Sequence, residues 1–181
     1  MSVFFLTFFT LYSGLHLFAL LRIRNAFGLR ALPVVCLSIF MACMILAPLF
    51  VRLFERADQM GAAQVTAYAG YLWKAWIFLF FVSLLAVDSL RFLVLGARKI
   101  GGFPFVETPH VQRWLVVTAI GLATVSSVYG FVEARTVRVN RVVVESSRLA
   151  PSRGEVRIAQ ISDLHLGLIV GKKRLNNIVS L

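Results

Sequence analysis

Asp163 and His165 are the residues of this chain whose types and spacing best suit chemistry. They lie two positions apart in "IAQISDLHLG" (158–167), directly after an apolar run rich in β-branched residues. A carboxylate supplies a hard, charged oxygen and a neutral imidazole supplies affinity for borderline transition metals, so both can bind one metal ion. Gly167 leaves the backbone free to turn there. The pair predicts half of a metal site; the alternative is an ordinary turn in which Asp163 caps the backbone and His165 is solvated.

A second group of residues suited to chemistry is basic. Lys172, Lys173 and Arg174 begin the stretch "KKRLNNIVSL" at a predicted helix start. Free backbone N–H groups at a helix N-terminus favour anions, so this cluster could contact a phosphate. A solvated basic turn explains the three residues at least as well. Two other histidines, His16 and His110, have no carboxylate or cysteine at ligand spacing, and we interpret both as structural.

The residue pattern around this stretch predicts the elements that position it. In "TVRVNRVVVE" (136–145) apolar and polar side chains alternate, which is the period-two pattern of a strand. A link leads to "EVRIAQI" (155–161), a second predicted strand, and the last residues predict a helix. Ligands of open α/β sheets bind beyond the carboxyl ends of strands, where Asp163 lies. We expect a first strand and linker over 134–154 and the beginning of an α/β domain over 155–181.

The rest of the chain is typical of a membrane protein. Hydrophobic residues make up 59% of the 181 residues, charged residues 15%, and the mean hydropathy is +0.83. Soluble domains carry about 25% charged residues, and about 20 apolar residues suffice to cross a bilayer. The sequence therefore predicts a four-span transmembrane region over 1–133. The predicted spans are 3–21, 31–51, 71–95 and 114–132.

The net charge of +11 is explained by the membrane rather than by nucleic acid. The basic residues lie in short clusters between apolar runs, so we expect the lipid bilayer as partner and no nucleic acid. Loop one holds Arg22, Arg24 and Arg30, and loop three holds Arg91, Arg98, Lys99 and Arg113. Cytoplasmic loops are enriched in such residues, so these two loops are expected inside and the C-terminal part outside. Arg135, Arg138 and Arg141 follow the fourth span and argue against this assignment. Basic residues at the start of a long translocated domain have less influence on membrane orientation.

Three features of the predicted spans concern packing and charge. Asp88 and Arg91 would share a helix face near the end of the third span. An acid inside a span suggests function, but we favour a pair that snorkels to the headgroups.

At the other end of that span an aromatic belt is expected at the interface, formed by Tyr68, Tyr71, Trp73 and Trp76. Small residues of the fourth span would admit a neighbouring helix closely: Gly121, Ala123, Ser126, Ser127 and Gly130.

The stretch that carries the possible metal ligands also resembles a known family. "RIAQISDLHLG" (157–167) resembles the first motif of the calcineurin-like metallophosphoesterases. "YGFVEARTVRVNRVVV" (129–144) is similar to the segment that joins the last span to the catalytic domain in their membrane-anchored bacterial members. The resemblance implies a β-sandwich with flanking helices and a hydrolase of phosphomono- or phosphodiesters. It also implies two divalent transition-metal ions (Mn, Fe or Zn), with Asp163 and His165 as ligands of one of them.

The remaining ligands of that family do not appear in these 181 residues. The family needs a Gly-Asp-x-x-Asp block, an Asn-His block and a Gly-x-His pair, yet Asp163 is the last acid here and His165 the last histidine. Two side chains cannot hold the two metal ions that clamp the attacking and leaving oxygens. We therefore expect this sequence to be an N-terminal part of a longer enzyme, inactive alone.

Two functions from different classes follow from these observations. The first is a multi-pass phosphoesterase of a bacterial inner membrane, whose phosphoester substrate could be lipid-linked because the site is held near the bilayer. The alternative is a non-enzymatic four-helix module that acts as anchor, sensor or small transporter, for which Asp88 is the candidate acid. On either interpretation the isolated segment 136–181 would expose unpaired strand edges, which favour association.

Overall fold

The computed structural model describes residues 2–102, 109–144, 156–161, 164 and 167–180. The chain divides into two compact units, Met1–Glu133 and Ala134–Leu181, and each is described by itself. The helices, in chain order, are α1 (Ser2–Phe27), α2 (Ala31–Arg56), α3 (Met60–Ile100), α4 (Pro109–Glu133) and α5 (Lys172–Val179).

Four of these helices, α1 to α4, are long and apolar enough to cross a membrane. A lipid environment offers the backbone no hydrogen-bond partners, so an apolar run of this length folds as a helix that bonds internally. Each helix continues past at least one end of the predicted span. The largest difference is in α3, whose 41 residues extend for about 60 Å, about twice the hydrocarbon thickness of a bilayer.

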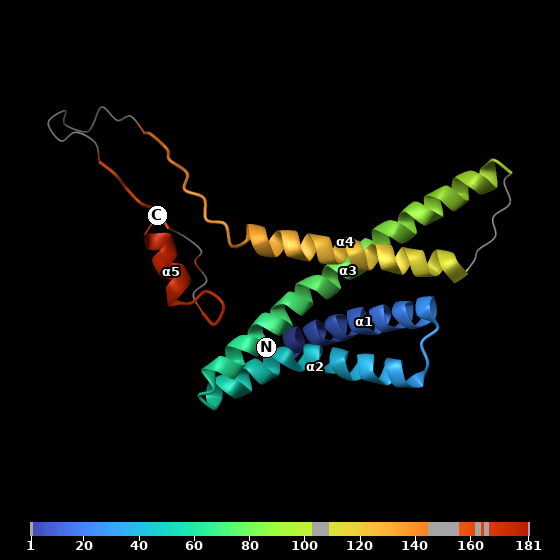
Figure 1. The fold of residues 1–181 in the computed structure, drawn as a ribbon, viewed down its shortest axis with the longest axis horizontal. Helices are drawn as coiled ribbons and strands as arrows, with labels where there is room; N and C mark the ends of the chain where they lie inside the picture. The colour runs from blue at the N-terminus through green and yellow to red at the C-terminus, as the bar shows by residue number, and fades with distance from the viewer. Residues whose placement is uncertain (1, 103–108, 145–155, 162–163, 165–166, 181) are drawn as a thin grey trace. The chain divides into compact units, whose positions relative to one another are not determined.

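Two short reversals join the first three helices. Gly28 has φ +61°, and beyond it the N–H of Leu29 donates to the carbonyl of Arg24 at 3.1 Å. This is the helix ending that a residue in the left-handed region allows and that glycine favours. Asp58 takes the same role between α2 and α3 with φ 55°, a conformation that aspartate tolerates better than most residues. These reversals lay α1 and α2 side by side and return the chain into α3 (Figure 1).

The core of the first unit is built around α3, which contacts α1, α2 and α4 (Figure 1). Its fully buried side chains Ile77, Phe80 and Leu84 recur at helical spacing, so they form one apolar stripe. The other three helices each supply buried side chains to the core. They are Tyr12, Ala19 and Ala26 of α1, Met41 of α2, and Val116, Ala119 and Ala123 of α4.

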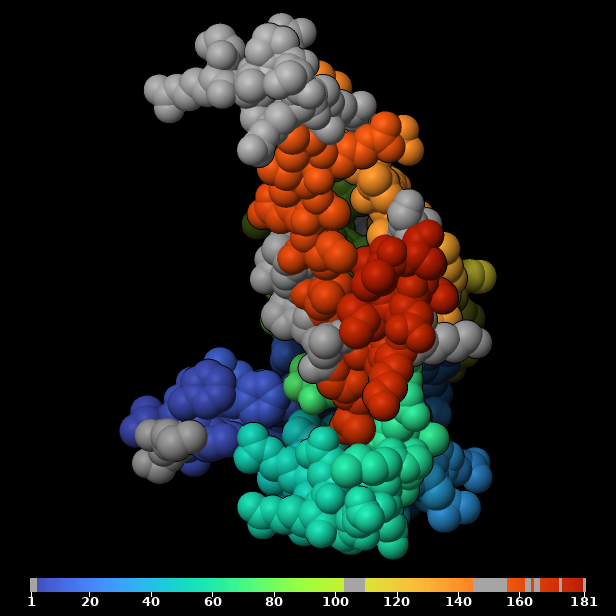
Figure 2. Space-filling view, turned by 90° about the vertical axis from the view of Figure 1, so that its left-hand side faces the viewer, coloured from blue at the N-terminus to red at the C-terminus, as the bar shows by residue number. Residues whose placement is uncertain are grey.

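A close helix contact lies between α2 and α3, at a position that the sequence did not predict. A Cβ added to Gly70 would lie 2.7 Å from the Cβ of Ala47, whereas nothing lies within 4 Å of a Cβ at Gly121 or Gly130. Ala63 and Ala67 continue the same buried stripe on α3. Small residues let two backbones approach, and in Figure 2 the end of α2 and the start of α3 (cyan to teal) form one continuous mass.

The α/β domain expected after the fourth span is contradicted by the structure. In the described part of 134–181, α5 is the only regular element. Residues 136–144 and 156–161 run without regular structure and form no strand. A strand needs a hydrogen-bonded partner, and alternation of side chains in a sequence does not supply one. The apolar side chains stay uncovered as a result, with Val143 88% and Ile158 87% exposed.

Substituting Gly70 tests the contact between α2 and α3. Gly70→Ala gains about 1 kcal/mol of helix propensity, but overpacking costs about 1–3 kcal/mol. We therefore expect a net loss of about 1 kcal/mol, measured as a lower Tm of the helical circular dichroism signal in detergent. The matched control is Gly121→Ala, which has open space around the new methyl and should leave Tm unchanged or raise it. An equal rise in both variants would contradict the close contact.

Candidate functional site

The predicted metal ligands Asp163 and His165 lie outside the described residues. The structure describes what flanks them. On one side Ile161 ends the segment 156–161. On the other side the N–H of Gly167 donates to the carbonyl of Val170 at 3.2 Å, which closes a turn where glycine was expected to permit one. The metal pair itself stays a prediction.

Of the predicted phosphate-proximal residues at the start of α5, the structure describes the side chains of Lys172 and Arg174. Lys172 is exposed, whereas the Arg174 Nη2 donates to the backbone carbonyl of Ala134. The side chain of Lys173 lies outside the described residues. Arg174 therefore holds α5 to the beginning of its own unit, which is a structural role that the sequence did not indicate.

Elsewhere in the described residues, no group of three or more His, Cys, Asp or Glu side chains is placed to hold a metal ion. His110 is exposed at the start of α4. His16, in contrast, is 2% exposed and belongs to the bundle core. Asp163 and His165 therefore stay metal-ligand candidates on the evidence of the sequence alone.

The Asp88 side chain makes an ion pair that joins two helices. The Arg22 Nη2 of α1 donates to both carboxylate oxygens of Asp88 on α3, at 2.7 and 2.6 Å. The side chains are 23% and 20% exposed respectively. Hydrogen bonds between two ionised groups are the strong ones, and pairing is how charged residues are accommodated in membrane spans. Sequence reasoning considered Arg91 on the same helix and missed Arg22, which lies 66 positions away.

A second contact at this end of the bundle fixes α4. The Arg113 Nε donates to the backbone carbonyl of Ala26 at 3.0 Å. The last carbonyls of a helix lack partners within it, so the guanidinium satisfies one of them at the end of α1. The end of α1, the Asp88 level of α3 and the start of α4 therefore meet at one end of the bundle.

His16 joins α1 to α3 further along the bundle. Its Nδ1 lies 2.7 Å from the carbonyl oxygen of Tyr12, and the Trp73 Nε1 lies 2.8 Å from its Nε2. A carbonyl only accepts and an indole N–H only donates, so Nδ1 carries the proton and Nε2 accepts. Both ring nitrogens of the neutral imidazole are used, so His16 has a structural role.

The tryptophans of the predicted aromatic belt are partly directed into the bundle. Trp73 and Trp76 stack with a centroid distance of 5.1 Å, and Trp76 stacks on the buried Phe80 at 5.3 Å. The Trp76 Nε1 also donates to the Thr124 Oγ1 of α4 at 3.1 Å. Aromatic pairs contribute beyond their buried area, so these rings hold α3 against its neighbours.

No family model, no curated protein and no solved structure matches this chain.

Replacing Asp88 tests the ion pair between α1 and α3. Asp88→Asn leaves the partly buried Arg22 guanidinium without a counter-ion. Breaking a fully buried pair costs about 3–5 kcal/mol, and solvent screening reduces that value, so we expect about 1–3 kcal/mol in thermal unfolding. The double variant Arg22→Met/Asp88→Asn should recover most of the loss because neither charge remains. A double variant as unstable as Asp88→Asn would show that the pair does not hold the helices.

Proposed function

We propose that this chain is the membrane anchor and first metal-ligand segment of a metal-dependent phosphoesterase. The observation that carries the proposal is the stretch 157–167, in which Asp163 and His165 follow an apolar run and precede Gly167. Four helices that are long and apolar enough to cross a membrane precede it. The turn from Gly167 to Val170 agrees with a chain that reverses after the two ligands.

The residues present do not fit a complete binuclear centre. Asp163 and His165 supply two ligands, and the described part of the chain places no further group of three ligating side chains together. Two metal ions need more ligands than these two side chains offer. On this proposal the remaining ligands belong to residues outside these 181, and no hydrolytic step is assigned to the chain itself.

The proposal includes the side of the membrane on which the segment acts. Contacts from Arg22 to Asp88 and from Arg113 to Ala26 gather the arginine-rich ends of α1, α3 and α4. Lysine and arginine are retained in the cytoplasm, so that end would be cytoplasmic and the segment after α4 extracytoplasmic. This placement favours a phosphoester substrate at the extracytoplasmic surface of the membrane, including a lipid-linked one.

Transport is the less favoured function for the helical unit. A small transporter needs an ionisable group that binds and releases its substrate or a proton inside the bundle. Asp88 was the candidate acid, and both of its carboxylate oxygens accept hydrogen bonds from Arg22. A carboxylate held in this way serves to join two helices, which favours an anchoring role.

The phosphoesterase proposal is tested on protein purified from its native membranes, which carry the chain as its gene encodes it. With Mn²⁺, Fe²⁺ or Zn²⁺ present, it should hydrolyse the diester bis-p-nitrophenyl phosphate or the monoester p-nitrophenyl phosphate. Asp163→Asn and His165→Gln should each lower kcat by at least about 100-fold, because even residues that only support metal ligands cost 10- to 100-fold.

The matched control is Asp58→Asn, which removes an acid from the reversal between α2 and α3 while keeping a residue that tolerates positive φ. It should leave kcat unchanged. Hydrolysis that is absent with all three metals, or that survives both ligand substitutions, rejects the phosphoesterase function and leaves the four helices as a non-enzymatic module.

A further inference from the structure

An apolar pocket of about 480 Å³ lies between α1 and α3. Its walls include Phe8, Leu11 and Leu15 from α1 and Phe78 from α3. Leu11 is 66% exposed and Phe78 55% exposed, so the pocket opens on an outward face of two helices that are apolar enough to lie in lipid. Its size is that of pockets that hold small-molecule ligands.

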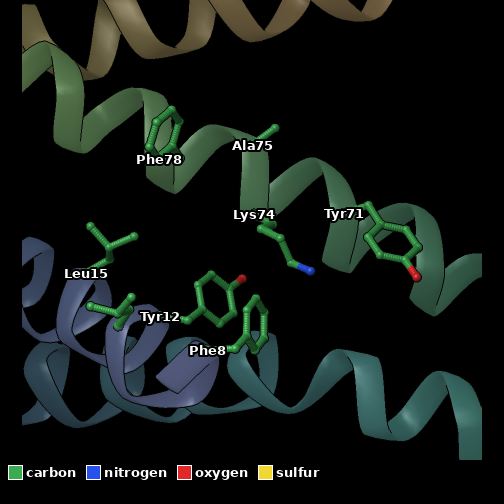
Figure 3. Close-up of a pocket in the computed structure, with 8 residues that line it drawn as sticks. Phe8, Tyr12, Leu15, Tyr71, Lys74, Ala75 and Phe78 are labelled. Carbon is green, nitrogen blue, oxygen red and sulfur yellow. The ribbon is translucent and has the colours of Figure 1, made fainter. Parts of the chain in front are cut away.

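One cation projects into this pocket. The Lys74 Nζ lies 5.0 Å from the ring centroid of Phe8, 5.8 Å from that of Tyr12 and 5.2 Å from that of Tyr71 (Figure 3). Within the described residues Lys74 takes no part in a salt bridge. Aromatic faces attract a cation but leave its charge uncompensated.

A buried donor lines the same pocket. Tyr12 is 4% exposed, and its hydroxyl has no hydrogen-bond partner in the part of the chain that the structure describes. Figure 3 shows the Tyr12 hydroxyl and the Lys74 ammonium in the same gap between α1 and α3. A buried hydroxyl without a partner is costly, so it marks a place where an acceptor is expected.

We propose that this pocket binds an anionic phospholipid of the bilayer. The lipid phosphate would accept from the Lys74 ammonium and the Tyr12 hydroxyl, and an acyl chain would lie along Leu11, Leu15 and Phe78. The phosphate compensates the charge of Lys74 and accepts a hydrogen bond from the unpaired Tyr12 hydroxyl. The hydrocarbon walls exclude a fully hydrated anion. Basic pockets between membrane helices bind acidic headgroups in this manner.

The level of the pocket in the bundle agrees with a headgroup. Lys74 lies beside Tyr71, Trp73 and Trp76 on α3, and tyrosine and tryptophan concentrate where headgroups meet hydrocarbon. On this proposal, the lipid phosphate meets Lys74 at that level. This site does not depend on the phosphoesterase proposal, because it uses only residues of α1 and α3.

The test measures lipid preference by fluorescence quenching of the full 181-residue chain in phosphatidylcholine vesicles. Trp114→Phe serves as background and leaves Trp73 and Trp76 as reporters next to the pocket. Brominated phosphatidylglycerol and brominated phosphatidylcholine are compared as quenchers. We expect phosphatidylglycerol to bind about fivefold more tightly, the factor that one lysine contributes at an anionic surface.

The variants separate this site from general attraction of the basic chain for acidic lipid. Lys74→Met should reduce the ratio of binding constants to about one, and Tyr12→Phe, which keeps the ring, should lower it to an intermediate value. Lys99→Met removes the same charge from the far end of α3 and should keep the wild-type ratio. Helical circular dichroism checks that each variant folds; if Lys74→Met does not, Tyr12→Phe decides alone.

Three results overturn the proposal. They are equal quenching by both lipids in the background chain, an unchanged ratio in every folded pocket variant, and loss of the preference when millimolar inorganic phosphate is added. The last of these would assign the site to a soluble anion instead of a lipid.

Discussion

The spacing of charge along α3 is the constraint on which the membrane unit depends. Lys74 and Asp88 are separated by a stretch without charge that is apolar except for Ser83. As a helix it extends about 21 Å between them, less than the roughly 30 Å of a hydrocarbon core. At least one of the two charges therefore lies at a depth where water is scarce and needs compensation from the protein. Asp88 receives it from the Arg22 guanidinium, and Lys74 receives part of it from three aromatic rings.

The Arg22 guanidinium and two of the three rings, Phe8 and Tyr12, are on α1, and this explains how α1 is held in register. Tyr12 and Arg22 are ten residues apart, or about 15 Å of helix, so parallel packing of α1 and α3 brings each toward its partner level on α3. His16 lies between them and accepts the Trp73 indole N–H. The α2–α3 contact uses small residues instead: Gly70 lies against Ala47 with no room for a Cβ. Polar contacts therefore specify the register of α1, and close backbone approach specifies that of α2.

Sequence reasoning identified the four apolar helices because three of the apolar runs are long enough to cross a bilayer, and the third span reaches that length when charged residues at its ends are included. It could not identify the Arg22–Asp88 pair, since nothing in a sequence distinguishes a partner 66 positions away from Arg91 three residues on. It predicted close packing on α4 from composition. Ala123 is indeed fully buried, whereas Gly121 and Gly130 face open space, because packing depends on which face of the helix meets a neighbour. The predicted strands over 136–145 and 155–161 were wrong, because alternation of apolar and polar side chains does not supply the neighbouring strand with which a strand must hydrogen-bond. The metal ligands Asp163 and His165 rest on local sequence alone, so they stay predictions.

The short distance between Lys74 and Asp88 also sets how this protein meets membranes of different thickness. The length of the α2 apolar run over 31–51 matches the hydrocarbon thickness of an average bilayer. The distance between Lys74 and Asp88 on α3 matches a thinner bilayer. Bilayers adapt to such hydrophobic mismatch by local thinning, and helices adapt by tilting, each at a modest cost per ångström. Since Arg22 and the aromatic rings fix α1 to α3 at both levels, the two helices must tilt together. Acyl-chain length thereby becomes a determinant of where in a cell this protein is most stable.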